Sequence, residues 1–434
     1  MPSTGLESLY SFRQALTMEP PVTNSPASRT PNLARFGAFS HLPFTVIWFA
    51  TTCSCTGIAI SDAASAWLMT NLNTDPALVS MVQVASSLPM FLFTFLAGVL
   101  ADMVDPRRFL IALELFITIS ILLFGGVIFM QWVTPNILLI ATFTLSACWS
   151  LATPVWLSIT PLLVPPEDLD SANSANSVGY NLSRAIGPAL AGFALSAFGP
   201  AAPYWIFGMA DSTTVMALFW WKSPKRPKRP TESFFTAIQT GVVYAAKNKK
   251  LRATFVRTIA VYPFACTYSA LLPLVARNQV TQGPKFYGVM LAVISIGAVI
   301  GSLILHQMRK WLGADSVVAA GTVGIAVALC LFGLAHSPAV ALIGALVAGG
   351  SWTIVLVGLY VSTFLCLDEW IRGRGVSIFL TVLFGSMTCG SMLWGQVAAK
   401  YGLPSAFFIS AGCLVLMIPL TWRWKLQAAQ GVNP

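Results

Sequence analysis

Long apolar runs alternate with short breaks of proline, glycine and charged residues along almost the whole of this 434-residue chain. A run of about 20 apolar residues is long enough to cross the hydrocarbon core of a bilayer as a helix, and a helix satisfies its backbone hydrogen bonds within lipid. The pattern therefore predicts an all-α membrane protein with twelve transmembrane helices. They are expected at residues 40–70, 77–101, 107–131, 135–163, 170–198, 203–222, 251–276, 284–307, 315–335, 338–366, 370–399 and 404–424.

A basic, proline-rich stretch at residues 222–230 separates the first six helices from the last six, and it is too polar to span a membrane. Residues 231–247 mix aromatic and aliphatic side chains with polar ones, which predicts an amphipathic helix on the membrane surface. Residues 1–34 are polar and rich in Pro, Ser and Thr, a composition typical of disorder. The expected parts are a disordered cytoplasmic tail (1–37), an N-terminal six-helix half (38–222), a cytoplasmic linker with an amphipathic helix (223–250), a C-terminal six-helix half (251–425) and a short tail (426–434).

The two halves share a glycine pattern in their fifth helices. Gly187 and Gly192 follow an acidic loop in the first half, and Gly390 and Gly395 follow an acidic loop at a similar distance in the second half. Such a repeat is typical of a duplicated transporter, whose substrate site lies near the middle of the membrane between the halves. The sequence therefore predicts two pseudo-symmetric halves.

Basic residues gather in the loops on one side of the predicted helices. Only Arg277, Lys285 and Lys400 fall in loops on the other side. Loops rich in Lys and Arg face the cytoplasm, so both termini are expected there. The net charge of +10 is explained by this bias and by attraction to anionic lipid headgroups. The expected macromolecular partner is the lipid bilayer, and no basic face outside the loops indicates a nucleic acid.

A polar stripe interrupts the fifth predicted helix. Asn173, Asn176, Tyr180 and Arg184 recur at a spacing of three or four residues, so a helix places them on one face, and Asn181 lies beside them. A charged side chain in a membrane helix costs roughly 3 kcal/mol or more and usually faces a polar cavity. We therefore predict that these residues line a substrate cavity.

Few ionisable residues fall inside the predicted spans. Proton coupling needs a carboxyl group whose affinity for a proton changes with desolvation and with the approach of a cation or substrate. Glu114 and Asp211 are the first candidates for this role and Asp62 is the third; each could instead form a structural ion pair or lie against water. Arg184 is expected to be a counter-ion or to bind an anionic substrate, and Arg257 is a further cavity candidate.

Two deep aromatic residues, Trp156 and Tyr360, either stack on an aromatic substrate or fill the core, and the pattern leaves both open. The eight cysteines lie in or beside apolar runs without metal-ligand or disulfide spacing. The three histidines are isolated and no nucleotide-binding or hydrolase motif occurs. The sequence therefore predicts a protein that is not an enzyme, has no metal site and uses no cofactor, and an ion gradient is expected as its energy source.

The loop between the second and third helices runs from Gly98 through Asp102 to Arg107 and Arg108. It resembles the signature loop of the major facilitator superfamily, in which these residues form a gating motif. Met103 replaces a basic residue of that motif, Asp105 replaces a glycine, and one proline is added before the arginines. A generic basic loop is the alternative explanation.

The fourth and fifth helices extend the resemblance. A proline-bearing fourth helix, a Val-Pro turn and the pattern Arg184-x-x-Gly187-Pro188-x-x-x-Gly192 are similar to the branch of the superfamily that contains the enterobactin exporter and related drug exporters. In total, the resemblance covers roughly residues 40–424. In this superfamily the Gly187-Pro188 pair is characteristic of antiporters, so the resemblance implies export. A packing kink without bearing on direction is the alternative.

These observations favour a proton-coupled secondary exporter that works by alternating access. Its substrates are expected to be protons and a small amphipathic molecule, either a siderophore or a drug-like compound. An uptake carrier for an organic anion and a non-transporting membrane scaffold are the competing hypotheses. The protein is expected to be monomeric and multi-pass in the bacterial cytoplasmic (inner) membrane.

Overall fold

The computed structural model describes residues 37–222, 248–368 and 372–427. Three predictions fall largely outside these residues: the disordered tail, the amphipathic helix of the linker and the end of the C-terminal tail.

The described chain is helical throughout its regular structure. Its elements are η1 (Gly37–Ser40), α2 (Leu42–Leu72), α3 (Pro76–Met103), α4 (Pro106–Phe129), α5 (Pro135–Leu163), η2 (Pro166–Asp168), α6 (Leu169–Phe198), α7 (Ala202–Trp220), α9 (Lys249–Ala265), α10 (Thr267–Leu274), η3 (Val275–Gln279), α11 (Pro284–Gly333), α12 (Pro338–Leu365), α13 (Arg372–Tyr401) and α14 (Leu403–Thr421).

These boundaries lie within three residues of the predicted ones, with two exceptions. The seventh predicted helix is divided into α9 and α10. The eighth and ninth predicted helices are joined in one element, α11, across a kink that falls within the predicted break at residues 308–314. Only Gly313 departs from helical backbone angles there, with φ of 73°. Glycine adopts this left-handed region without a steric cost, so α11 changes direction at a single residue.

The starts of several helices follow from local sequence. A polar side chain accepts a hydrogen bond from a backbone N–H of the first turn, and a proline occupies the next position, where its missing N–H costs nothing. These pairs are Asp75-Pro76, Asp105-Pro106, Thr134-Pro135 and Ser337-Pro338. The same pairs act as the breaks between apolar runs, which is why the boundaries could be predicted.

Within the described residues, nine helices are long and apolar enough to cross a membrane. The consecutive helices α6 and α7 are not among them, although α5 before them and the span that begins in α9 after them are. The polar stripe of α6 makes this helix less apolar than the helices that qualify as membrane spans.

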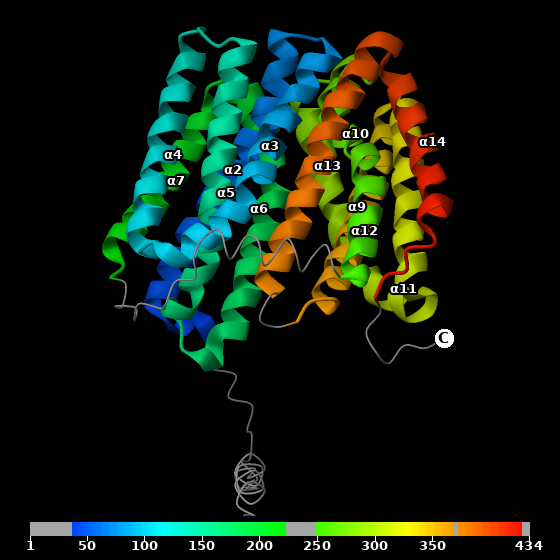
Figure 1. The fold of residues 1–434 in the computed structure, drawn as a ribbon. Coiled ribbons are helices and arrows are strands. Elements are labelled where there is room, and N and C mark those ends of the chain that lie inside the picture. Colours follow the sequence, from blue (N-terminus) through cyan, green and yellow to red (C-terminus); the bar gives the residue numbers. More distant parts are fainter. Residues whose placement is uncertain (1–36, 223–247, 369–371, 428–434) are drawn as a thin grey trace, which may run out of the picture.

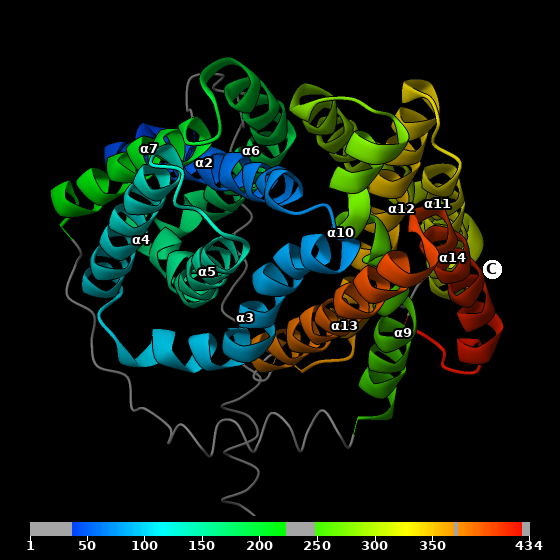
Figure 2. The ribbon, with the colours of Figure 1, turned by 90° about the horizontal axis from the view of Figure 1, so that it is seen from above.

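The helices form two groups that lie side by side, α2–α7 and α9–α14 (Figures 1 and 2). In the first group α2 packs against α6 and α7, and α4 packs against α7. In the second group α11 packs against α12 and α14, and α9 against α13. The groups meet mainly where α3 contacts α13 and where α6 contacts α11.

The two ends of the bundle differ in charge. At the end where α2 and α9 begin and α14 ends lie Arg107, Arg108, Lys250 and Arg423; we call it the basic end. The opposite end, which contains the turn between α2 and α3, is called the far end.

Candidate functional site

Helix α6 presents a different kind of surface on each side. Val178, Leu182 and Phe193 are exposed apolar residues on one side. At 100° per residue, Arg184 and Ser177 lie on the opposite side, and they too are exposed. The exposed apolar side is suited to contact with lipid, and the exposed polar side is suited to contact with water.

A third side of α6 is built from small residues that let α2 approach closely. A Cβ added at Gly187 would lie 2.5 Å from Ala59 Cβ. Nearer the basic end, Ser183 donates a hydrogen bond to the carbonyl of Thr52 (3.0 Å) and accepts one from Thr56 (3.0 Å). These contacts set the register between α2 and α6.

The predicted stripe lies on the polar side of α6. The Arg184 guanidinium lies over the Tyr180 ring, 5.8 Å from its centroid, and Asn173 and Asn181 are exposed. Asn176 is half-buried and donates a hydrogen bond to Thr160 of α5 (3.4 Å). The stripe therefore consists of exposed groups and one amide that packs against a neighbouring helix.

Asp62 of α2 is also exposed. It lies about 140–160° around the helix from the exposed apolar residues Leu42 and Phe49, so it faces away from their lipid-facing surface. Asp62 lies within electrostatic range of Arg184 and of Tyr287 on α11. The three side chains that follow Asp62 along α2 are buried. Asp62 therefore lies at the inner limit of the water-facing part of α2.

The far end is closed where α6 crosses α11. A Cβ at Gly192 would lie 2.6 Å from the carbonyl oxygen of Pro284, and a Cβ at Gly288 would lie 2.5 Å from that of Pro188. The backbones can approach this closely only because both residues lack a side chain. The predicted Gly-Pro motif thus lies at a contact between the two groups of helices.

Two further contacts join the groups at the far end. The rings of Trp67 and Tyr287 are stacked with centroids 5.8 Å apart. Arg277 donates hydrogen bonds to Thr70 Oγ1 (3.1 Å) and to Asn71 Oδ1 (2.5 Å) at the end of α2. Together with the glycine crossing, they join the two groups of helices at the far end.

Glu114 and Asp211 lie together inside the first group of helices, as buried groups on α4 and α7. Ser54 and Thr118 donate hydrogen bonds to the two oxygens of Asp211 (2.7 and 2.6 Å), and Trp156 donates one to Glu114 (2.7 Å). The two carboxyl groups also interact with each other. Among the described residues, no basic side chain pairs with either of them.

Arg257 lies apart from these residues. Its side chain is 4% exposed, and its guanidinium is 2.7 Å from the carboxylate of Asp315 on α11. Lys425 lies 3.9 Å from the same carboxylate. Arg257 thus forms an ion pair near the basic end, and it also lines a small pocket between α9, α11 and α14.

Tyr360 is partly exposed on α12 and meets Phe379 of α13 edge-on, with centroids 6.2 Å apart. In the part of the chain that the structure describes, no interaction connects it to Arg184.

The loop between α3 and α4 is described in part. Arg107 donates hydrogen bonds to the carbonyls of Leu218 and Phe219 at the end of α7 (3.0 and 2.9 Å). Cations are favourable at the C-terminal end of a helix, so Arg107 holds α4 against α7. Gly98 faces α13, Arg108 is exposed, and the side chain of Asp102 lies outside the described residues.

The sequence analysis missed four residues of these clusters. Thr118 could have been found, because it lies one helical turn after Glu114. Ser54, Tyr268 and Tyr287 carried no signal of their own, since only the packing of other helices brings them to the carboxyl groups or to Arg184. Among the described residues, no group of His, Cys, Asp or Glu is arranged to hold a metal ion.

A bundle of long apolar helices with buried ionisable groups and an exposed polar helix side is typical of membrane transporters. The family model of the transmembrane secretion effectors matches residues 33–433. The chain therefore belongs to this family, which is part of the major facilitator superfamily.

Three relatives are efflux or siderophore transporters. The multidrug efflux pump Tap of Mycolicibacterium fortuitum is 24% identical, over 87% of this chain and 93% of its own. Macrolide efflux protein A of Streptococcus pyogenes is 24% identical, over 68% and 73%. The staphyloferrin A transporter of Staphylococcus aureus is 22% identical, over 79% and 86%. These relatives are transporters, not enzymes.

The fold has solved counterparts. The crystal structure of a bacterial homologue of the human lysosomal transporter Spinster superimposes with a TM-score of 0.69, covering 88% of this chain and 96% of its own at 11% identity. The chain is thus a multi-pass transporter with the major facilitator fold.

Proposed function

We propose that this protein is a proton-coupled secondary exporter of a small amphipathic molecule in the bacterial inner membrane. Twelve transmembrane helices follow if α9 and α10 form one span and α11 forms two spans that meet at Gly313. The basic end then faces the cytoplasm, and both termini lie there. The efflux function of two relatives supports the outward direction.

The arrangement around α6 supports alternating access. Its polar side is exposed from Asn173 to Arg184, whereas Pro188 and Ala191 further along are buried. The cavity is therefore open toward the basic end and closed at the far end. Opening the far end requires the crossing of Gly192 and Gly288 to separate.

The buried carboxyl pair is the observation that carries the proposal. Two carboxyl groups this close cannot both be ionised without a large cost when no cation compensates them. We therefore place at least one proton on the pair of Glu114 and Asp211. Gain or loss of that proton changes the hydrogen bonds from Ser54, Thr118 and Trp156.

Helix α2 connects this pair to the cavity. It carries Ser54, which binds Asp211, and Asp62 eight residues later, about 12 Å along the same helix. A proton-dependent movement of α2 thus reaches both the substrate cavity and its contact with α6. The pair lies away from the cavity, so proton and substrate are expected to act through α2 without competing for one group.

The test is transport by purified protein in proteoliposomes. An imposed pH gradient should drive a fluorescent drug-like substrate of fixed positive charge, such as ethidium, against its concentration gradient. Replacement of Glu114 by Gln or of Asp211 by Asn should abolish this coupled flux and leave dye binding in place. Replacement of the exposed Glu167 by Gln is the matched control and should have no effect.

Full coupling in both pair variants would overturn the assignment of the proton site. Accumulation of an organic anion in cells, with no efflux, would favour the uptake carrier. Unchanged solute fluxes after replacement of Arg184 by Gln would favour the scaffold.

A further inference from the structure

We propose that the substrate is an amphoteric aromatic molecule, which places a cationic group at Asp62 and an anionic group at Arg184. This inference rests on the proposed export function and names its substrate class. Asp62 makes no hydrogen bond or ion pair with any described residue, and Arg184 has no acidic partner within 4.0 Å among them. Opposite charges held apart inside a membrane protein mark a place where a ligand supplies the missing partners.

The distance between the charges follows from the packing of α2 on α6. Ala59 lies against Gly187, and both helices begin at the basic end. Asp62 is therefore level with residue 190, which is six residues beyond Arg184, or about 9 Å along the helix. A molecule with its charged groups at opposite ends of a ring system fits this separation.

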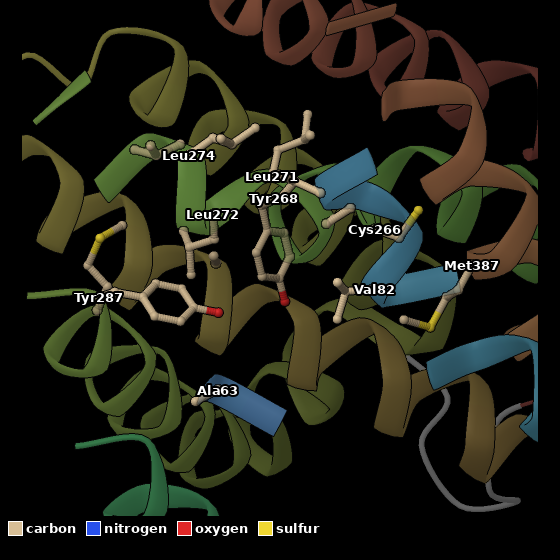
Figure 3. Close-up of a cluster of buried hydrophobic side chains, with 14 of the residues drawn as sticks. Ala63, Val82, Cys266, Tyr268, Leu271, Leu272, Leu274, Tyr287 and Met387 are labelled. Atoms are coloured by element: carbon tan, nitrogen blue, oxygen red, sulfur yellow. The ribbon is translucent and has the colours of Figure 1, made fainter. Parts of the chain in front are cut away.

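Tyrosines from both groups of helices surround the space between the charges. The Tyr180 ring lies beside the Arg184 guanidinium. Tyr268 of α10 lies within electrostatic range of Arg184, and Tyr287 of α11 lies within that range of Asp62. In Figure 3 the hydroxyl groups of Tyr268 and Tyr287 point toward the same space, and neither forms a hydrogen bond with a described residue.

This set of groups selects for both charges at once. Aromatic rings beside the space stack on an aromatic ligand, and free hydroxyls donate to or accept from its polar substituents. A bound ligand displaces water from Asp62 and Arg184, so a ligand with a single charge leaves one of the two residues without water and without a partner. Such an unpaired charge is a basis for rejecting the ligand.

Three related compounds test whether the site requires both charges of the ligand or only one of them. Norfloxacin carries an ammonium and a carboxylate at opposite ends of an aromatic system; its methyl ester carries only the ammonium, and its N-acetyl derivative carries only the carboxylate. Affinities are measured in detergent without a pH gradient, by equilibrium dialysis. We expect norfloxacin to bind about tenfold more tightly than either derivative, because each lost charge pair is worth about one decade.

The variants assign each charge to its residue. Replacement of Asp62 by Asn should weaken norfloxacin and its ester about tenfold and leave the N-acetyl derivative unchanged. Replacement of Arg184 by Gln should weaken norfloxacin and the N-acetyl derivative and spare the ester. The unaffected compound shows in each case that the variant is folded. Replacements of Asp170 by Asn and of Lys310 by Gln, at exposed positions, are the matched controls.

Three results would overturn this inference. The native protein could bind all three compounds with equal affinity, it could bind none of them, or one variant could weaken the binding of all three equally. Selective binding of norfloxacin without export under a pH gradient would contradict the proposed function alone. Coupled export of the ester with the same affinity as norfloxacin would contradict only the amphoteric site.

Discussion

Trp156 of α5 donates its indole N–H to a carboxylate oxygen of Glu114 on α4 over 2.7 Å. This bond ties the fourth helix of the first group to the buried carboxyl pair. It is also the one hydrogen bond to Glu114 from outside the pair among the described residues. The protonation state of Glu114 and the position of α5 are therefore linked.

Replacement of Trp156 by Phe should remove this donor and retain a large ring. A hydrogen bond to a charged group is worth about 1.5–3 kcal/mol, so coupled transport should slow about tenfold or more. In the native protein the indole N–H stabilises the ionised carboxylate of Glu114. Without this N–H the carboxylate binds its proton more tightly, so the pH profile of transport should move to higher pH. The measurement is the initial rate of pH-driven flux in proteoliposomes between about pH 5 and 9.

Replacement of Trp132 by Phe is the control for this variant, because Trp132 is 68% exposed in the far-end turn before α5. Its rate and pH profile should equal those of the native protein. A Trp156 variant with a native profile would show that the indole bond has no part in coupling.

Replacement of Gly288 by Val should prevent closure of the far end. Its Cβ would lie 2.5 Å from the carbonyl oxygen of Pro188 and 3.3 Å from Gly192, and backbone atoms there cannot move aside cheaply. The variant should favour the state that is open at the far end and should lose transport. The measurement is the labelling rate of a single cysteine placed at Tyr180, probed from the outside with a membrane-impermeant maleimide.

The control for the Gly288 variant is replacement of Gly412 by Ala in α14, where an added Cβ meets nothing within 4 Å. It should leave labelling and transport unchanged. Equal labelling in the Gly288 variant and the native protein would mean that the glycine crossing is not the closure.

The boundaries of the helices could be predicted because apolar runs and their Asp-Pro, Thr-Pro and Ser-Pro starts are local features. The division of α11 could also be predicted, because residues 308–314 are charged and contain Gly313. The kink between its two helices lies at Gly313, within the predicted break. The helical backbone of the residues on either side of Gly313 could not be predicted, because a helix tolerates charges where it leaves the apolar layer.

The candidate site was predictable one helix at a time. Helical spacing identified the polar side of α6, and burial cost identified Glu114 and Asp211 as special. Tertiary packing determines which helices contact each other, and helical spacing gives no information about it. The sequence therefore did not indicate that Thr118 binds Asp211 or that Arg257 pairs with Asp315. Arg257 is the instructive case, because a lone charge in an apolar run has the same pattern whether it faces a cavity or a buried partner.

Replacement of Asp315 by Asn should destabilise the protein through Arg257. The arginine is 4% exposed and would remain charged without its partner, a situation that costs about 3–5 kcal/mol. Asp315 also accepts a hydrogen bond from the backbone N–H of Leu426 (3.1 Å), so the C-terminal segment should loosen. The measurement is the thermal unfolding midpoint in detergent, which should fall by several degrees.

A double variant tests whether the loss arises from the unpaired charge. With Arg257 replaced by Met in the same chain, no buried charge remains, and most of the midpoint should return. A double variant as unstable as the single one would assign the loss to the C-terminal segment instead.

Replacement of Arg277 by Ala should shift the protein toward the state open at the far end. Its side chain joins η3 to Thr70 and Asn71 of α2 across the two groups of helices. These bonds are exposed in part, so together they contribute about 1 kcal/mol, which corresponds to a roughly fivefold change in the ratio of closed to open molecules. The measurement is the distance distribution between spin labels at positions 73 and 282. Replacement of the exposed Lys400 by Ala removes the same charge at the same end, where the ammonium lies only over the ring of Tyr401 (5.2 Å), and should leave the distribution unchanged. If both variants widen the distribution equally, the net charge of the far end, and not the contact of Arg277 with α2, determines the closed state.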